Sequence, residues 1–317
     1  MLYQFKGDDF LQSLLLNIVI AWSFNFIIIT STQAKNSQIV VEYTLENKNK
    51  IIKGRKTENG YQFNASSKNI LNLATLEWPP YIGENLCNKG WVFQLTVALL
   101  VSKGYQVNIH FFPWARSVKM VEQGEMDILF PEYFIEGSAP SDVIKGKKRS
   151  ELLVLSNQFP GGNTSFLKRK GEEIDFDGDL ASLKGQVIGV VRGYQNMPEF
   201  DAMMDAKLFK VISAVDELQL MKLLIGKRVD LIVGDSKVFR YSVNYSTLSN
   251  SNKQALLNGV EDVKPELKYN HLYFALSSKS AKWRILLDDI NLALLTFKQN
   301  GQTQHIIENG SGCVVDF

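Results

Sequence analysis

The sequence predicts an α/β protein with two lobes, each built from βαβ-type units. The first observation is the segment GKRVDLIVGD at 226–235, in which a glycine follows a helical pattern and a continuous apolar run then forms a buried strand. The second is that a similar order recurs earlier, with a helical pattern at 117–121, Gly124 and an apolar run at 126–130. The third is size, because 317 residues with 45% hydrophobic content allow two cores. Two such lobes would face each other across a cleft.

The first lobe is expected to follow the order strand, helix, strand, helix, strand. A Pro-Pro pair ends the first of these strands, and Pro113 occupies a favourable first-turn position of the second helix. The expected elements are strands at 70–76, 105–112 and 126–130 and helices at 91–102 and 114–121.

The second lobe repeats this order after a long loop at 131–148 and a short strand at 152–156. Gly161 and Gly162 fit a crossing between the lobes, because glycine allows the backbone changes of a hinge. Gly226 is expected to be a left-handed helix cap. The expected elements are strands at 186–191, 209–213 and 231–235, a helix at 215–225, a strand at 269–277 that returns to the first lobe, and a closing helix at 283–297.

These elements give a domain plan with a two-strand hinge. We expect the first part of lobe I at 70–164, lobe II at 165–270 and the return strand and last helix of lobe I at 271–317. Residues 35–69 are polar and are expected to form an extension with a hairpin.

The N-terminal residues indicate export. An apolar run precedes a small-x-small site that ends at Ala34, so residues 1–34 are interpreted as a cleaved signal peptide. The alternative is an uncleaved membrane anchor, which the acidic residues Asp8 and Asp9 favour. Both cysteines, Cys87 and Cys313, are then able to pair in an oxidising compartment or to remain thiols.

The composition excludes several function classes. A net charge of +2, with bases and acids interspersed, leaves no basic patch for nucleic acid. The three histidines are far apart and lack the spacing of zinc ligands, and no dinucleotide or phosphate-binding fingerprint occurs. We therefore expect no catalytic residue, metal or cofactor.

Six motifs in this order resemble bacterial periplasmic solute-binding proteins of ABC transporters, in particular the polar amino acid family (family 3, type II periplasmic binding fold). The resemblance covers about residues 70–309 and rests on the order and spacing of the motifs together. They are ATLEWPPY at 74–81, PWAR at 113–116, GEMD at 124–127, an arginine seven residues before Ser156, LKG with GVVRGY at 183–194, and RVD at 228–230 with an aspartate five residues further on.

The resemblance implies which residues would touch a ligand. Arg149 matches the arginine that clamps a carboxylate, and Asp235 matches the aspartate that holds an ammonium group. An aromatic that packs on the ligand corresponds to Trp114. The remaining expected contacts are Glu77, Trp78, Tyr81, Arg116, Arg192 and Tyr194. The family's Gly-x-Thr run before the arginine is missing, so a carboxylate is specified more firmly than an amino acid.

Each assignment has a structural alternative. Arg149 follows three lysines and would then be one more solvated base, while Asp235 would be the N-cap of a helix that begins at residue 236. Trp78 and Trp114 would belong to the core, and Arg116 would support its loop. Asp127 and Asp230 are interpreted as structural residues of their strands.

The resemblance implies a monomeric periplasmic protein that captures a small carboxylate-bearing solute, such as an amino acid or an analogue, for an ABC transporter permease in the inner membrane. One alternative is a sensory protein of the same fold that signals to a membrane partner. A dehydratase-like enzyme is a further alternative, and it would need an acid such as Glu77 beside the ligand.

Overall fold

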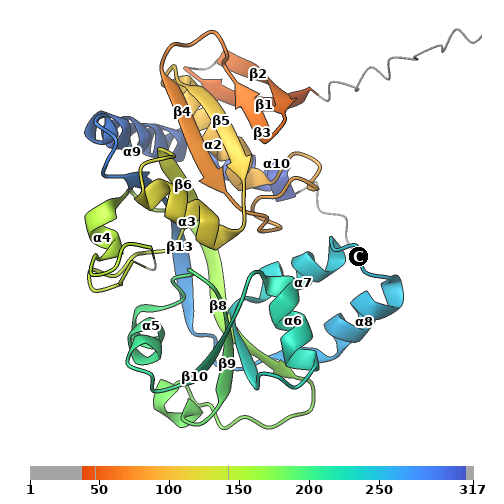
Figure 1. Cartoon of the computed structure of the whole chain (residues 1–317). Helices are drawn as coiled ribbons and strands as arrows, with labels where there is room; N and C mark the ends of the chain where they lie inside the picture. The colour runs from red at the N-terminus through yellow and green to blue at the C-terminus, as the bar shows by residue number, and fades with distance from the viewer. Residues whose placement is uncertain (1–37, 47, 142, 312–317) are drawn as a thin grey trace, which may run out of the picture. The chain divides into compact units, whose positions relative to one another are not determined.

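Two long strands connect the two halves of the structure, a computed structural model that describes residues 38–46, 48–141 and 143–311 (Figure 1). Strands β8 (Phe159–Arg169) and β13 (Lys268–Ser277) pair antiparallel. At one end β13 also pairs with β6 (Ile128–Glu132), and at the other β8 pairs with β11 (Leu231–Asp235). We refer to the half that contains β6 as the first lobe and to the half that contains β11 as the second lobe. The predicted two-lobed α/β fold with a two-strand hinge is confirmed.

The first lobe has a sheet in which β4 is parallel to both of its neighbours, β5 and β6. Residues 39–63, expected as an extension, form three strands of which β3 pairs with β5, so they widen this sheet. The strands are β1 (Ile39–Leu45), β2 (Lys48–Thr57), β3 (Gly60–Phe63), β4 (Ile70–Thr75), β5 (Gln106–Phe111), β6 and the short β7 (Leu153–Leu155) beside β13. The helices are α2 (Trp91–Ser102), α3 (Trp114–Glu122), α4 (Arg149–Leu152), α9 (Trp283–Gln299) and α10 (Gln302–Ser311).

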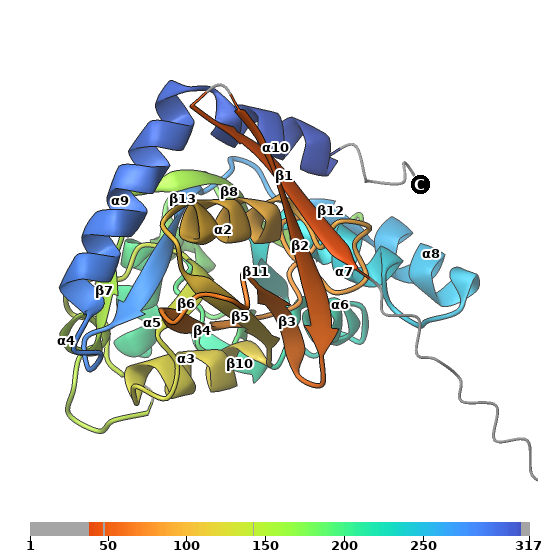
Figure 2. The ribbon, with the colours of Figure 1, turned by 90° about the horizontal axis from the view of Figure 1, so that it is seen from above.

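Helix α2 is apolar around most of its circumference because other elements cover most of its faces. Ten consecutive residues from Trp91 to Leu100 are buried, as expected for a helix that lacks a solvent face. It packs on β5 and is covered by α9, α10 and β1, which lie around it in Figure 2. The C-terminal helices therefore complete the core of the first lobe.

The second lobe has a sheet in the order β8, β11, β9, β10, with β9 parallel to β11 and β10. Figure 1 shows α5 on one side of this sheet and α6 and α7 on the other. Apolar residues fill both faces, with Phe200 of α5 on one and Phe239 of α7 on the other. The elements are η1 (Leu180–Leu183), β9 (Val187–Val191), α5 (Pro198–Asp205), β10 (Lys210–Ala214), α6 (Glu217–Ile225), α7 (Ser236–Asn244), α8 (Asn250–Asn258) and β12 (Val260–Asp262).

Equivalent aspartates anchor the central strand of each lobe to its neighbour. Oδ2 of Asp127 accepts a hydrogen bond from N of Asn72 at 2.8 Å, and Oδ2 of Asp230 accepts one from N of Val187 at 2.8 Å. Both carboxylates thus tie their own strand to the adjacent parallel strand. The structural interpretation of Asp127 and Asp230 is confirmed.

The expectation that Gly226 is a left-handed helix cap is wrong. Gly226 has φ −75°, and the left-handed residue after α6 is Lys227 with φ 56°. Gly161 and Gly162 lie within β8, where neither has a positive φ. Glycine is required at both positions for close approach, because a Cβ on Gly161 would overlap the carbonyl of Asn270 and a Cβ on Gly162 would overlap the side chains of Tyr81 and Asp235.

The predicted signal peptide, residues 1–34, lies outside the described residues. Cys87 is disulfide-bonded, and Cys313, the second cysteine of the sequence, lies outside the described residues. None of the helices within 38–311 combines the length and the apolar character that a membrane crossing requires.

Candidate functional site

Each lobe places a buried carboxyl group at the end of its central strand. Strand β6 ends at Glu132 and β11 ends at Asp235, and these side chains belong to residues only 2% and 5% exposed. Ligands of open α/β sheets collect at this carboxyl edge. The two acids therefore mark the candidate site.

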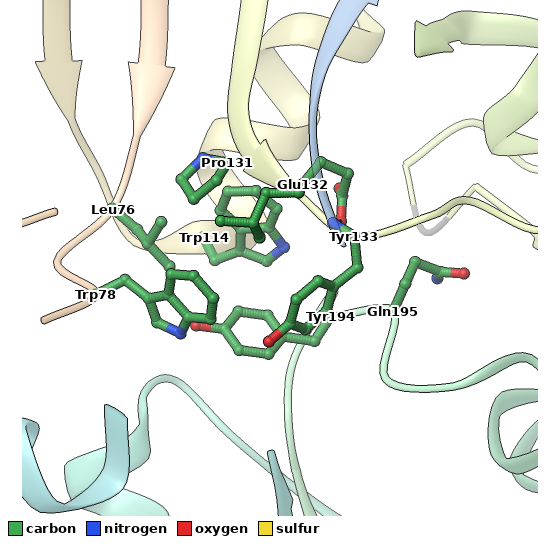
Figure 3. A pocket seen from close by; sticks show the side chains of 9 residues that line it. Leu76, Trp78, Trp114, Pro131, Glu132, Tyr133, Tyr194 and Gln195 are labelled. Carbon is green, nitrogen blue, oxygen red and sulfur yellow. The ribbon is translucent and has the colours of Figure 1, made fainter. Parts of the chain in front are cut away.

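Aromatic rings from both lobes enclose a small cavity at this edge (Figure 3). Trp78 packs edge to face on Tyr133, with centroids 5.7 Å apart, and Trp114 packs in the same way on Tyr194 at 5.8 Å. The space open to the centre of a water molecule is about 20 Å³, enough for about one water. The cavity is lined by Leu76, Trp78, Trp114, Pro131, Glu132, Tyr133, Tyr194, Gln195 and Leu272.

Aromatic donors of the first lobe hydrogen-bond to acceptors of the second. Oη of Tyr81 donates to Oδ2 of Asp235 at 2.6 Å, and Nε1 of Trp114 donates to the carbonyl of Gly193 at 3.1 Å. The ring of Tyr81 also stacks on Trp78, with centroids 4.4 Å apart. These bonds hold the lobes in a closed arrangement.

Glu217, the first residue of α6, lies behind the aromatic rings. It is 4% exposed, and its Oε1 accepts a hydrogen bond from Oη of Tyr194 at 2.7 Å. Burial raises the pKa of the Glu217 carboxyl to about 7, although hydrogen bonds from Tyr194 and Trp78 oppose the rise. Since Trp78 belongs to the first lobe, Glu217 also takes part in the contact between the lobes.

Asp235 caps a helix and faces the other lobe at the same time. Its Oδ1 accepts a hydrogen bond from N of Lys237 at 2.8 Å, so it is the N-cap of α7. Its Oδ2 accepts the bond from Tyr81. Burial raises the pKa of Asp235, and both bonds act against that rise.

Arg149 is buried in the first lobe, so its interpretation as a solvated base is wrong. The residue is 1% exposed, and its Nε lies 3.6 Å from Oε1 of Glu122, which is 0% exposed. Oγ of Ser141 donates to Oε2 of the same glutamate at 2.5 Å. On its other side the guanidinium approaches Gly193 of the second lobe. Arg149 therefore forms a buried ion pair at the rear of the cleft.

The guanidinium of Arg149 also acts on Glu132. Burial raises the pKa of the Glu132 carboxyl to about 7, Arg149 and the N–H of Tyr133 limit the rise, and the carboxylates of Asp201 and Glu122 add to it. Oε1 of Glu132 accepts a hydrogen bond from that N–H at 2.9 Å. Its Oε2 is buried and has no hydrogen-bond partner among the described residues.

Three of the residues predicted to touch a ligand lie away from the cavity. Glu77 is exposed, and its Oε1 accepts a hydrogen bond from N of Glu84 at 2.8 Å within the same loop. Arg116 is exposed with its guanidinium over the ring of Phe112. Arg192 is also exposed and lines a different hollow of the second lobe.

The remaining predicted residues come together. Trp78, Trp114 and Tyr194 line the cavity and also pack in or against the core of the first lobe, so the core and site interpretations both describe them. Tyr81 and Asp235 form the contact between the lobes beside it.

Sequence reasoning missed Glu132, Tyr133, Gln195 and Glu217. A signal for Glu132 was present, because it follows Asp127 by five residues as Asp235 follows Asp230. Within the described residues, no group of three or more His, Cys, Asp or Glu side chains is arranged to hold a metal ion.

Solved structures with the same fold are numerous, although no protein-family model and no curated protein matches the sequence. One is a histidine kinase sensor domain with similarity to periplasmic binding proteins, with a TM-score of 0.61 and 17% identity over 78% of this chain and 97% of that one. Another is an ancestral arginine-binding protein bound to arginine, with a TM-score of 0.59 and 21% identity; the match covers 77% of this chain and 98% of that one. A third is an arginine transport-system periplasmic binding protein from Legionella pneumophila, with a TM-score of 0.56 and 14% identity; the match covers 76% of this chain and 99% of that one.

The chain has the two-lobed periplasmic binding-protein fold. The likeness to the polar amino acid family that the sequence motifs indicate is therefore confirmed at the level of the fold. The neighbouring structures named here are described as sensor or binding proteins.

Proposed function

We propose that this periplasmic binding-protein fold captures a small solute between its lobes, an amino acid or a close analogue, and closes on it without changing it chemically. The observation that carries the proposal is the cavity at the carboxyl edges of both sheets, enclosed by aromatic rings and buried carboxyl groups of both lobes. A site shared by two lobes couples binding to closure, since only the closed form makes all contacts.

Capture requires the lobes to separate first. The closed cavity holds about one water, so a solute of amino acid size enters only when Trp78, Tyr133 and their neighbours move apart. The bonds from Tyr81 to Asp235 and from Trp114 to Gly193 then break. In this proposal, the lobes close again around the solute, and contacts with the solute compensate for the hydrogen bonds that were broken.

The proposed cellular role is delivery of the solute to an ABC transporter permease in the inner membrane, with the exported chain acting as a periplasmic monomer. The neighbouring structure described as an arginine transport-system periplasmic binding protein supports this role. A sensory role is the second candidate, because one neighbour is the sensor domain of a histidine kinase. Deletion of the gene separates the two, since a transport role predicts loss of solute uptake and a sensory role predicts loss of a transcriptional response.

A thermal-shift screen of amino acids, amines and small carboxylates on the exported protein tests the proposed function. A solute that binds only the folded form stabilises it by about 2.7 kcal/mol at a hundredfold excess over its dissociation constant. We expect at least one solute to raise the melting temperature. Absence of a shift with every compound of the set would contradict the proposal.

A further inference from the structure

The resemblance implies a ligand carboxylate at Arg149, but this guanidinium already faces a carboxylate of its own chain. Arg149 and Glu122 are 1% and 0% exposed and lie 3.6 Å apart. Ser141 holds the other oxygen of Glu122 in place. Moving either charge away removes a neighbouring opposite charge from the buried partner, which is unfavourable. Arg149 therefore balances Glu122.

No second base replaces Arg149 at the cavity. Among the described residues that line it, none is Lys or Arg. Arg116 and Arg192, the other two arginines predicted to touch the ligand, are both exposed and point elsewhere. Within this lining, a ligand carboxylate would therefore meet no basic side chain.

The same region contains an excess of buried acids. Glu132, Glu217 and Asp235 are 2%, 4% and 5% exposed. Glu217 and Asp235 accept hydrogen bonds from neutral tyrosine hydroxyls, and Oε2 of Glu132 has no hydrogen-bond partner within the part of the chain that the structure describes. A buried carboxyl oxygen without a donor is compensated either by protonation of the group or by a cation beside it.

The walls of the cavity are suited to the same charge. The rings of Trp78, Trp114, Tyr133 and Tyr194 converge on it in Figure 3. Aromatic faces attract ammonium and guanidinium groups, most strongly where water is excluded. Rings and carboxyl groups together form an environment for a desolvated cation.

We propose that the solute of this cleft is a small organic cation, an alkylammonium or guanidinium compound, and that its recognition does not require a carboxylate. This inference rests on the proposed function, because it assigns the solute class of the same cleft. Oε2 of Glu132 receives a hydrogen bond from the cation, and the four aromatic rings surround its charge.

Pairs of compounds that differ by one carboxylate test this inference on the unmodified protein. Calorimetry compares L-arginine with agmatine and L-lysine with cadaverine, and uses glutarate as an anion control. We expect each amine to bind within about fivefold of its amino acid or more tightly, and glutarate not to bind. Amino acids that bind a hundredfold more tightly than their decarboxylated partners would overturn the inference.

A matched pair of variants tests the part assigned to Glu132. Glu132→Gln keeps the shape of the side chain and removes its charge, so agmatine or cadaverine should bind about 10- to 100-fold more weakly. Glu125→Gln makes the same change at an exposed position of the first lobe and should have no effect. Unchanged affinity in Glu132→Gln, with folding verified by urea denaturation, would remove this carboxyl group from the recognition of the cation.

Failure of this inference differs from failure of the proposed function. If only neutral or anionic solutes shift the melting temperature and close the lobes, the protein still captures a solute and the cation assignment is wrong. If nothing binds across the whole set, the proposed function itself is wrong.

Discussion

Tyr81→Phe is expected to open the lobes, because it removes a single hydroxyl group that joins them. Oη of Tyr81 donates to Oδ2 of Asp235 at 2.6 Å, and both residues are 5% exposed. A hydrogen bond to a charged acceptor contributes about 1.5 to 3 kcal/mol. Asp235 keeps its bond from Lys237, which places the expected cost near 2 kcal/mol. The ratio of closed to open molecules should then fall about 30-fold.

The assay is the distance between dyes attached to the two lobes, measured by energy transfer without solute. Tyr105→Phe is the matched control, because Oη of Tyr105 donates to Oδ2 of Asp289 at 2.7 Å within the first lobe. The control should lower the free energy of unfolding and leave the distance between the lobes unchanged. Equal distances in Tyr81→Phe and the unmodified protein, or equal opening in both variants, would refute this account of closure.

Three further predictions concern closure, pH and the disulfide. Gly162→Ala should separate the lobes while each stays folded, because the new methyl group overlaps the side chains of Tyr81 and Asp235; a larger radius of gyration with an unchanged circular dichroism spectrum would show it. A cation should bind most tightly above pH 7 and more weakly as the pH falls below 7, because protonation of Glu132, with its pKa of about 7, removes the negative charge that attracts the cation. Calorimetry at pH 5.5 and 8 measures this change, and equal affinities at the two pH values would contradict it. Reduction of the Cys87 disulfide should lower the free energy of unfolding by about 2 to 5 kcal/mol, and urea denaturation with and without reductant measures it, an unchanged midpoint being the contrary result.

The fold was predictable because its signals are local. The pattern from 215 to 235 specifies α6 and β11 through apolar spacing and a continuous apolar run, and both elements occur close to the expected bounds. The left-handed position was misplaced by one residue, since the chain turns at Lys227 and glycine alone does not determine where a helix unwinds. The three N-terminal strands were not expected in the sheet, because they join it through the pairing of β3 with β5, two segments that lie far apart in the sequence.

The site was predictable only in part, because burial and charge pairing are properties of the assembled fold. Arg149 follows three lysines and looks solvated in the sequence, whereas its environment depends on Glu122 of a different helix. Arg192 follows a strand as a ligand-contact residue would, and the turn that begins there leaves it exposed. The five-residue spacing that both lobes share could have predicted Glu132. The adjacent Pro131 argued against it, because a proline suggests that the strand has ended, whereas β6 continues to Glu132.

The pairing of Asn163 with Tyr269 has a consequence for how this protein is assembled. The chain enters the second lobe along β8 and leaves it along β13 at directly opposed positions, and such partners in an antiparallel pair lie about 5 Å apart. In topological terms the second lobe is an insertion into the first, with adjoining ends that a short turn is able to bridge. Segments inserted in this way commonly fold as independent units. Substitutions within one lobe therefore need not change the backbone path of the other. Only the residues that line the cleft must remain complementary between the two lobes.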